Sequence, residues 1–183
     1  MDKPTLSAYD TSPGRYVKHQ LAIEPERIWK LVETYFVSGG ETADVGCGAG
    51  RDTDWMNQRG FPTVGYDASE GMLAEARARF PKAGFRAADM PELAAIKDDS
   101  VVNVLCMAVL MHLPKADIIT AGLNLLRIMR DGGRMILSFR RSKILDEREE
   151  DGRLYTPIDS GELSLLFESL GASVIWRETD AGG

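Results

Sequence analysis

The chain has few cysteines, no long apolar run and no excess of positive charge. Its two cysteines, Cys47 and Cys106, lie far apart and form no Cys-x-x-Cys pair, which excludes a disulfide scaffold and a zinc module. No apolar run approaches the ~18 residues of a membrane span, and the first residues do not resemble a signal peptide. A net charge of −6 disfavours a broad basic face for nucleic acid. We therefore expect a cytoplasmic protein that binds no metal, membrane or nucleic acid.

The composition is that of an ordinary globular domain, with 44% hydrophobic and 27% charged residues. Its apolar and glycine pattern predicts alternating strands and helices. Strands are expected over 42–45, 61–66, 84–87, 101–109, 134–139 and 172–176, and helices over 15–38, 51–59, 70–80, 114–131 and 160–170. The charged run 146–153 is expected to be a solvated loop.

This alternation predicts a single α/β domain with a doubly wound, mostly parallel sheet and helices on both faces. We divide it into an N-terminal helical lid, or cap region, over 1–40 and a sheet domain over 41–183. In such sheets, ligands bind beyond the carboxyl ends of the strands. The candidate motifs of this chain all follow expected strands.

A glycine-rich loop follows the first expected strand. Asp44 precedes three alternating glycines, Gly46, Gly48 and Gly50. Glycine lets the backbone turn sharply and lets a ligand approach without a Cβ in the way. The next strand ends at Asp67, where a carboxylate can accept hydrogen bonds from both hydroxyls of a ribose. The pattern favours a nucleoside-type ligand, with a purely structural turn as the alternative.

The register of the glycines argues against a dinucleotide site. The NAD fingerprint Gly-x-Gly-x-x-Gly requires a third glycine where this chain has Arg51 or Thr53, depending on which glycine starts the count. No Gly-Lys-Ser/Thr sequence occurs either, so a P-loop is absent. An NAD-linked oxidoreductase is therefore disfavoured.

Several linked motifs resemble those of the class I S-adenosylmethionine-dependent methyltransferases. DVGCGAGRD at 44–52 is similar to their first motif, GYDASEGML at 65–73 to their second and AADMPEL at 87–93 to their third. The segments 104–114 and 125–139 resemble the later strands of small-molecule members. The resemblance covers 42–176. It implies a Rossmann-like fold with S-adenosylmethionine as cofactor and S-adenosylhomocysteine as product.

The resemblance also implies roles for individual residues. Asp67 would hold the ribose hydroxyls, and Asp89 would accept from the adenine amine while Met90 donates its backbone N–H. Met72 and Met107 could instead be core filling. The full set of implied cofactor contacts is Tyr9, Arg15, Asp44, Gly46, Cys47, Gly48, Gly50, Arg51, Asp67, Ala68, Met72, Ala88, Asp89, Met90 and Met107.

The acceptor side is less clearly marked. Methyl transfer from a sulfonium needs alignment and exclusion of water, and a catalytic base is optional. His112, just beyond the fourth expected strand, is the best candidate base and acceptor contact, with a helix-entry histidine as the alternative. Arg140 and Arg141 could bind an anionic group on the acceptor or be solvated. No Asn/Asp-Pro-Pro-Tyr/Phe motif follows the fourth strand, which disfavours methylation of nucleic-acid bases.

The expected function is therefore methyl transfer from S-adenosylmethionine to a small-molecule acceptor. A module that senses the nucleoside without turnover is the alternative, because it would keep Asp67 and Asp89. The family usually ends in an antiparallel strand hairpin, whereas this chain is expected to have one final strand, 172–176. The sequence gives no indication of the oligomeric state.

Overall fold

A central sheet of five parallel strands organises the molecule, which the computed structural model describes over residues 1–140 and 146–179. The strand order is β3-β2-β1-β4-β5, so the order reverses between the neighbours β1 and β4. This arrangement confirms the predicted doubly wound, Rossmann-like sheet. The strands are β1 (Thr42–Val45), β2 (Thr63–Asp67), β3 (Gly84–Ala87), β4 (Val101–Met107) and β5 (Met129–Ser138).

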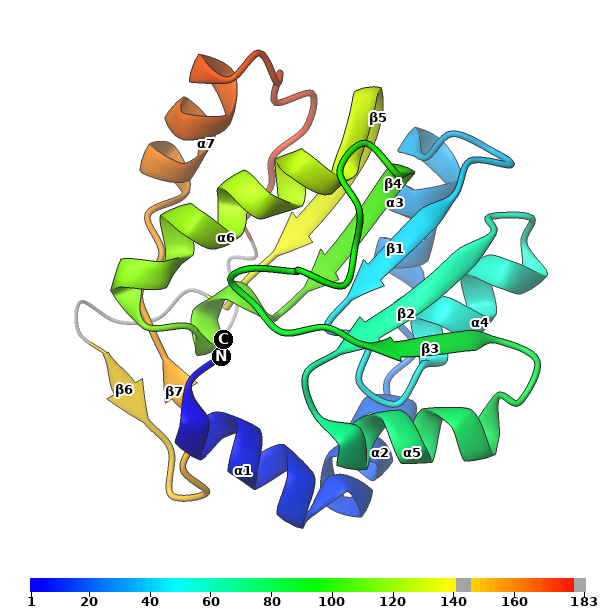
Figure 1. The fold of residues 1–183 in the computed structure, drawn as a ribbon, viewed down its shortest axis with the longest axis vertical. Helices are drawn as coiled ribbons and strands as arrows, with labels where there is room; N and C mark the ends of the chain where they lie inside the picture. The colour runs from blue at the N-terminus through cyan, green and yellow to red at the C-terminus, as the bar shows by residue number, and fades with distance from the viewer. Residues whose placement is uncertain (141–145, 180–183) are drawn as a thin grey trace.

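Helices cover both faces of this sheet (Figure 1). Side chains alternate along β4: Val104 and Cys106 belong to one buried cluster, and Leu105 belongs to another, because successive residues of a strand point to opposite faces. The first cluster includes α6 (Lys115–Ile128) and α7 (Ser160–Ser169), and the second includes α3 (Glu26–Tyr35) and α4 (Arg51–Gln58). The helix α5 (Glu70–Arg79) packs beside β3.

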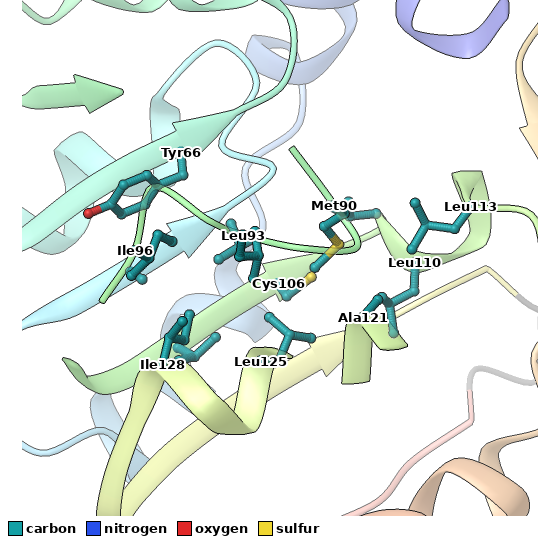
Figure 2. Close-up of a cluster of buried hydrophobic side chains, with 14 of the residues drawn as sticks. Tyr66, Met90, Leu93, Ile96, Cys106, Leu110, Leu113, Ala121, Leu125 and Ile128 are labelled. Carbon is teal, nitrogen blue, oxygen red and sulfur yellow. The ribbon is translucent and has the colours of Figure 1, made fainter. Parts of the chain in front are cut away.

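The larger core lies between the sheet and α6 (Figure 2). The segment after β3 places Met90, Leu93 and Ile96 against side chains of β4 and α6. All three are at most 3% exposed. The third sequence motif is therefore anchored by its apolar residues, and Met90 contributes its side chain to the core.

The N-terminal segment differs from the single helix predicted over 15–38. It forms α1 (Lys3–Thr11), α2 (Pro13–Leu21) and α3. The break between α2 and α3 falls just before Pro25, because a proline lacks the N–H that a helix interior needs and restricts the residue before it. The sequence pattern does not indicate α1, which begins at a cap where Asp2 accepts a hydrogen bond from the Thr5 N–H. In Figure 1, α1 and α2 lie beyond the carboxyl ends of the strands.

Two predicted boundaries near β5 are wrong. Helix α6 ends at Ile128, and the glycines expected to end it, Gly132 and Gly133, lie inside β5. A register shift interrupts the β4–β5 pairing there, between Val101 and Asn103. Glycines inside a strand often mark such a bulge.

The end of the chain also differs from expectation. Residues 172–176 form no strand, and among the described residues no strand pairs with the outer edge of β5. Trp176 instead lies beneath the Arg27 guanidinium of α3, 5.9 Å from the ring centroid. Apolar, β-branched residues can satisfy a strand pattern, but a strand forms only where a neighbour offers its hydrogen bonds.

The charged run 146–153 contains more structure than the predicted loop. β6 (Glu147–Arg148) pairs antiparallel with β7 (Leu154–Tyr155). Ion pairs join Arg153 to Glu149 and Asp151 within this hairpin. The charged side chains therefore stabilise a β-hairpin, whereas the charge run predicted a solvated loop. None of the helices in the described parts of the chain is long and apolar enough to cross a membrane.

Candidate active site

The glycine loop after β1 requires its glycines for packing as well as for any ligand. Gly46, Gly48 and Gly50 have φ angles of 75°, 55° and 80°, a region that other residues rarely adopt. A Cβ on Gly46 would lie 2.1 Å from Val109 Cγ2, and one on Gly50 would lie 2.5 Å from Phe85 Cζ. Two of the three glycines are thus explained by side chains packed against the loop.

Asp67 joins the end of β2 to this loop. Its Oδ2 accepts a hydrogen bond of 2.8 Å from the Gly48 N–H, and its Oδ1 accepts one of 2.9 Å from the Ser69 N–H. Burial raises the pKa of Asp67, and the N–H groups of Ser69 and Gly48 oppose that shift. The acid and the glycine loop, predicted separately, are therefore brought into direct contact.

The Asp44 side chain contacts α4. Its Oδ2 accepts a hydrogen bond of 2.6 Å from the Thr53 hydroxyl. Burial and the neighbouring Asp52 raise the pKa of Asp44 to about 7, so the carboxyl is partly protonated near neutral pH. This geometry ties α4 to β1 and thereby fixes the loop that connects them.

The N-terminal helices cover the glycine loop through Gln20, which the sequence pattern did not single out. Gln20 Oε1 accepts from the Ala49 N–H at 2.8 Å, and its Nε2 donates to the Cys47 carbonyl at 3.3 Å. Arg51 fixes the end of α2 by donating to the carbonyls of Gln20 and Ile23. A glutamine in an amphipathic helix is unremarkable, so no signal in the sequence could have found it.

Gln20 also occupies the space above Gly48. A Cβ on Gly48 would lie 2.5 Å from Gln20 Oε1. The space that a glycine leaves at this position is therefore filled by the side-chain amide of Gln20 from α2. A ligand that lies against Gly48 has to move the tip of Gln20.

The third motif contacts the start of the chain. The Met1 ammonium lies 3.0 Å from Asp89 Oδ1 and donates to the Met90 carbonyl. The Asp89 side chain is otherwise exposed, and the Ala88 N–H donates to the Asp67 carbonyl. Asp89 thus forms an ion pair with a charged ammonium group.

His112 lies between α1 and β7 at the carboxyl end of the sheet. Its Nδ1 is 2.6 Å from the Leu154 carbonyl oxygen, and its Nε2 is 3.3 Å from the Tyr9 hydroxyl. A carbonyl only accepts, so Nδ1 carries the proton and the Nε2 lone pair faces Tyr9. Burial lowers the pKa of His112, so the ring is neutral at pH 7.

The remaining predicted residues are scattered. Ala68 and Met72 follow Asp67, and Met72 is buried against Val17 and Ala49. Cys47 is buried beside Gly65. Met107 packs against the cluster that contains α3. Arg15 is exposed and lies 3.8 Å from Asp151, and Arg140 forms an ion pair with Glu149. Arg141 lies outside the described residues.

A parallel sheet with this strand order and a glycine loop after β1 defines the Rossmann-like class of α/β domains. Within that class, residues 43–137 match the family model "Methyltransferase domain". This match covers more than half of the chain. The chain therefore belongs to the methyltransferase domain family, which confirms the resemblance inferred from its motifs.

Curated relatives are ubiquinone biosynthesis O-methyltransferases. The chain is 31% identical over 121 residues to the one from Dechloromonas aromatica, covering 63% of this chain and 51% of that protein. It is 36% identical over 114 residues to the one from Bordetella parapertussis, covering 60% and 47%. The chain thus spans about half the length of these relatives.

Solved structures share the fold. 1,6-Didemethyltoxoflavin-N1-methyltransferase from Burkholderia thailandensis, solved with 1,6-didemethyltoxoflavin and S-adenosylhomocysteine, has a TM-score of 0.71 at 19% identity, covering 91% of this chain and 75% of that one. A SAM-dependent methyltransferase from Archaeoglobus fulgidus has a TM-score of 0.66 at 16% identity, covering 84% and 72%. At such identities the likeness establishes the fold alone.

Proposed function

We propose that this chain is an S-adenosylmethionine-dependent methyltransferase domain that methylates a small-molecule acceptor. The observation that carries the proposal is the hydrogen bond that Asp67 Oδ2 accepts from the Gly48 N–H. It joins the carboxylate suited to a ribose to the loop suited to a close ligand approach. Family membership and the names of the relatives support the same reaction.

The residues fit the cofactor in most respects. Asp67 has the position and charge to hold ribose hydroxyls, and Asp89 carries a carboxylate, a group that only accepts hydrogen bonds when ionised. Gly48 leaves space for the amino-acid part of the cofactor, provided that the Gln20 amide moves away. When bound, S-adenosylmethionine supplies a methyl group on a positively charged sulfur, so the protein has mainly to align the acceptor and exclude water. We retain the cofactor contacts predicted from the motifs as part of this proposal.

The lid of residues 1–40 would close the site. Arg51 and the Gln20 amide hold α2 on the loop, and Tyr9 packs against the cluster that contains Ala49 of the same loop. Such a cover excludes water from a reactive sulfonium. We accordingly keep the division into a cap region, 1–40, and a sheet domain, 41–183.

A small acceptor and a cytoplasmic location complete the proposal. The net charge of −6 and the small-molecule relatives support a metabolite rather than nucleic acid. The described thiols of Cys47 and Cys106 are buried and unpaired, which supports a reducing compartment.

Calorimetry tests the cofactor assignment. Wild-type protein should bind S-adenosylhomocysteine and S-adenosylmethionine, and Asp67→Ala should weaken both. Glu75→Ala, at an acidic residue on α5 that pairs with the exposed Arg79, serves as a matched control. Labelled cofactor and a low-mass metabolite extract then test transfer. Binding of NAD in place of these nucleosides would contradict the proposal, and binding with no transfer to any metabolite would leave only a nucleoside-sensing module.

A further inference from the structure

We propose that the side chain of Gln20 is an internal competitor for the amino-acid part of the cofactor. Its amide holds the glycine loop, and a nucleoside that carries an amino-acid tail displaces it on binding. Gln20 thereby determines how strongly the site distinguishes nucleosides with this tail from those without it. The inference rests on the proposed function and extends it from the identity of the cofactor to the control of its affinity.

The Gln20 amide satisfies both kinds of polar group that the loop presents. Its Oε1 accepts a hydrogen bond of 2.8 Å from the Ala49 N–H, and its Nε2 donates one of 3.3 Å to the Cys47 carbonyl. An amino-acid group offers the same pair of functions, because its carboxylate accepts and its ammonium donates. The amide therefore makes the type of hydrogen bonds that the tail of the cofactor makes when it lies on this loop.

The amide also takes the space that such a tail needs. A Cβ on Gly48 would lie 2.5 Å from Gln20 Oε1 and 3.2 Å from both Cδ and Nε2. All three heavy atoms of the amide thus surround the position where a glycine lets a ligand approach the backbone. The amide and the tail cannot share this space, so their binding to the loop is mutually exclusive.

Displacement has to move only the side chain of Gln20. The guanidinium of Arg51 donates to the carbonyls of Gln20 and Ile23 at 2.6 and 2.7 Å. One turn earlier on α2, Val17 is 2% exposed in a cluster that contains Ala49. These contacts hold the end of α2 in place independently of the amide. The Gln20 residue is itself half-buried, so its side chain can turn into solvent.

The charges around the loop favour an amino-acid tail over the neutral amide. Burial raises the pKa of the Cys47 thiol, and the carboxylates of Asp44 and Asp67 raise it as well, so both acids act on the loop at this residue. A cation near the Cys47 carbonyl is favoured by the same acids. Hydrogen bonds to charged groups are also about twice as strong as those between neutral groups. The tail therefore outcompetes the Gln20 amide.

The Ala49 N–H determines what the tail has to contain. When the amide leaves, the Cys47 carbonyl keeps its hydrogen bond of 3.0 Å from the Gly50 N–H, whereas the Ala49 N–H loses Gln20 Oε1. Ala49 is fully buried, and a buried N–H that loses its acceptor is costly. A ligand that displaces the amide must therefore supply an acceptor, which the carboxylate of the amino-acid group does. A nucleoside that ends before this group leaves Gln20 in place.

A matched pair of ligands tests the competition. S-adenosylhomocysteine and methylthioadenosine are both neutral thioether nucleosides, and only the first carries the amino-acid tail. In calorimetry, Gln20→Ala should bind S-adenosylhomocysteine about fivefold or more tightly than wild type, because two hydrogen bonds no longer have to be broken. Its affinity for methylthioadenosine should be unchanged. Gln58→Ala is the matched control, since Gln58 is exposed and donates to Asp54 within α4; it should match wild type for both ligands.

The sign of the change separates the alternatives. Weaker binding of S-adenosylhomocysteine by Gln20→Ala means that Gln20 contacts the tail in the complex, and unchanged binding means that the amide does not compete. Either result overturns the proposal. Equal tightening for both ligands overturns it too, because a general change in α2 would then explain the gain without competition for the tail.

Nitrogen NMR of wild-type protein follows the amide directly and does not depend on the stability of a variant. The chain has two glutamines, Gln20 and Gln58. S-adenosylhomocysteine should shift the Gln20 side-chain amide signal towards that of a solvated amide, and methylthioadenosine should leave it in place. The Gln58 signal should respond to neither ligand.

This measurement also separates failure of the inference from failure of the proposed function. A Gln20 signal that keeps its position under saturating S-adenosylhomocysteine overturns the competition, while the protein remains a binder of the cofactor's product. Failure of wild-type protein to bind S-adenosylhomocysteine or S-adenosylmethionine at all would overturn the proposed function itself.

Discussion

Replacing Gly48 by alanine should separate backbone strain from the loss of the contact with Gln20. The matched control is Gly60→Ala, because Gly60 has a φ of +85° and nothing within 4 Å of an added Cβ. Gly48 has a φ of +55°, and its Cβ would lie 2.5 Å from Gln20 Oε1. Both variants carry the left-handed backbone cost of about 1–2 kcal/mol. Only Gly48→Ala also places its methyl group too close to Gln20 Oε1.

The extra cost follows from what Gln20 holds. To clear the new methyl group, its amide has to leave the Ala49 N–H and the Cys47 carbonyl. Each such bond contributes about 0.5–1.5 kcal/mol to stability, so Gly48→Ala should lose about 1–3 kcal/mol more than Gly60→Ala. A chain of this size loses roughly 2–4 °C of Tm per kcal/mol. Thermal and urea denaturation of both variants measure the difference.

A double-mutant cycle checks the cause. Gln20→Ala removes the amide that collides, so the combined Gly48→Ala and Gln20→Ala variant should be no less stable than Gly48→Ala alone. Saturating S-adenosylhomocysteine, which adds about 2.7 kcal/mol at 100 times its Kd, should stabilise Gly60→Ala more than Gly48→Ala. Equal losses in the two glycine variants, or full additivity with Gln20→Ala, would refute the reasoning.

Three further outcomes are expected. Asp67→Ala removes charge-assisted hydrogen bonds of about 1.5–3 kcal/mol each and should weaken S-adenosylhomocysteine binding at least tenfold by calorimetry; unchanged affinity in the folded variant contradicts the site. Asp44, whose pKa rises from 3.8 to about 7 by burial and by Asp52, binds its proton more tightly in the folded state. Its contribution to stability should therefore be present at low pH and lost as the pH rises to about 7. Urea denaturation of Asp44→Asn should show a flatter pH dependence over that range, and an identical slope would count against this. Asp159→Ala removes the cap that accepts from the Gly161 N–H and should cost about 0.5–2 kcal/mol of stability without changing ligand affinity; altered calorimetric affinity would show that α7 reaches the site.

Local chemistry made much of the sheet and its loop predictable from the sequence. The helices predicted over 51–59 and 70–80 and the strand predicted over 101–109 agree with α4, α5 and β4 to within two residues, because helix caps, terminal glycines and apolar runs act over a few residues. The proximity of Asp67 to the glycine loop was also predictable, because parallel strands bring their carboxyl ends to one edge of a sheet.

The elements predicted wrongly depend on distant partners. Residues 172–176 have a strand pattern but no described strand beside them, and the charged run 146–153 forms a hairpin through ion pairs that composition does not reveal. Gly132 and Gly133 act as a bulge in β5 instead of a helix end, because the preceding residues already pair with β4. Pairing is a property of the neighbour as much as of the strand.

The sequence by itself determined the fold class and the loop–acid core of the candidate site, since both follow from short-range patterns and the geometry of parallel strands. Only the tertiary structure decided that Gln20 covers Gly48, and that Tyr9 meets His112 across more than a hundred residues of chain. No local spacing encodes such contacts. They arise when α1 and α2 fold over the carboxyl ends of the strands, where burial and hydrogen bonding together select which polar groups meet.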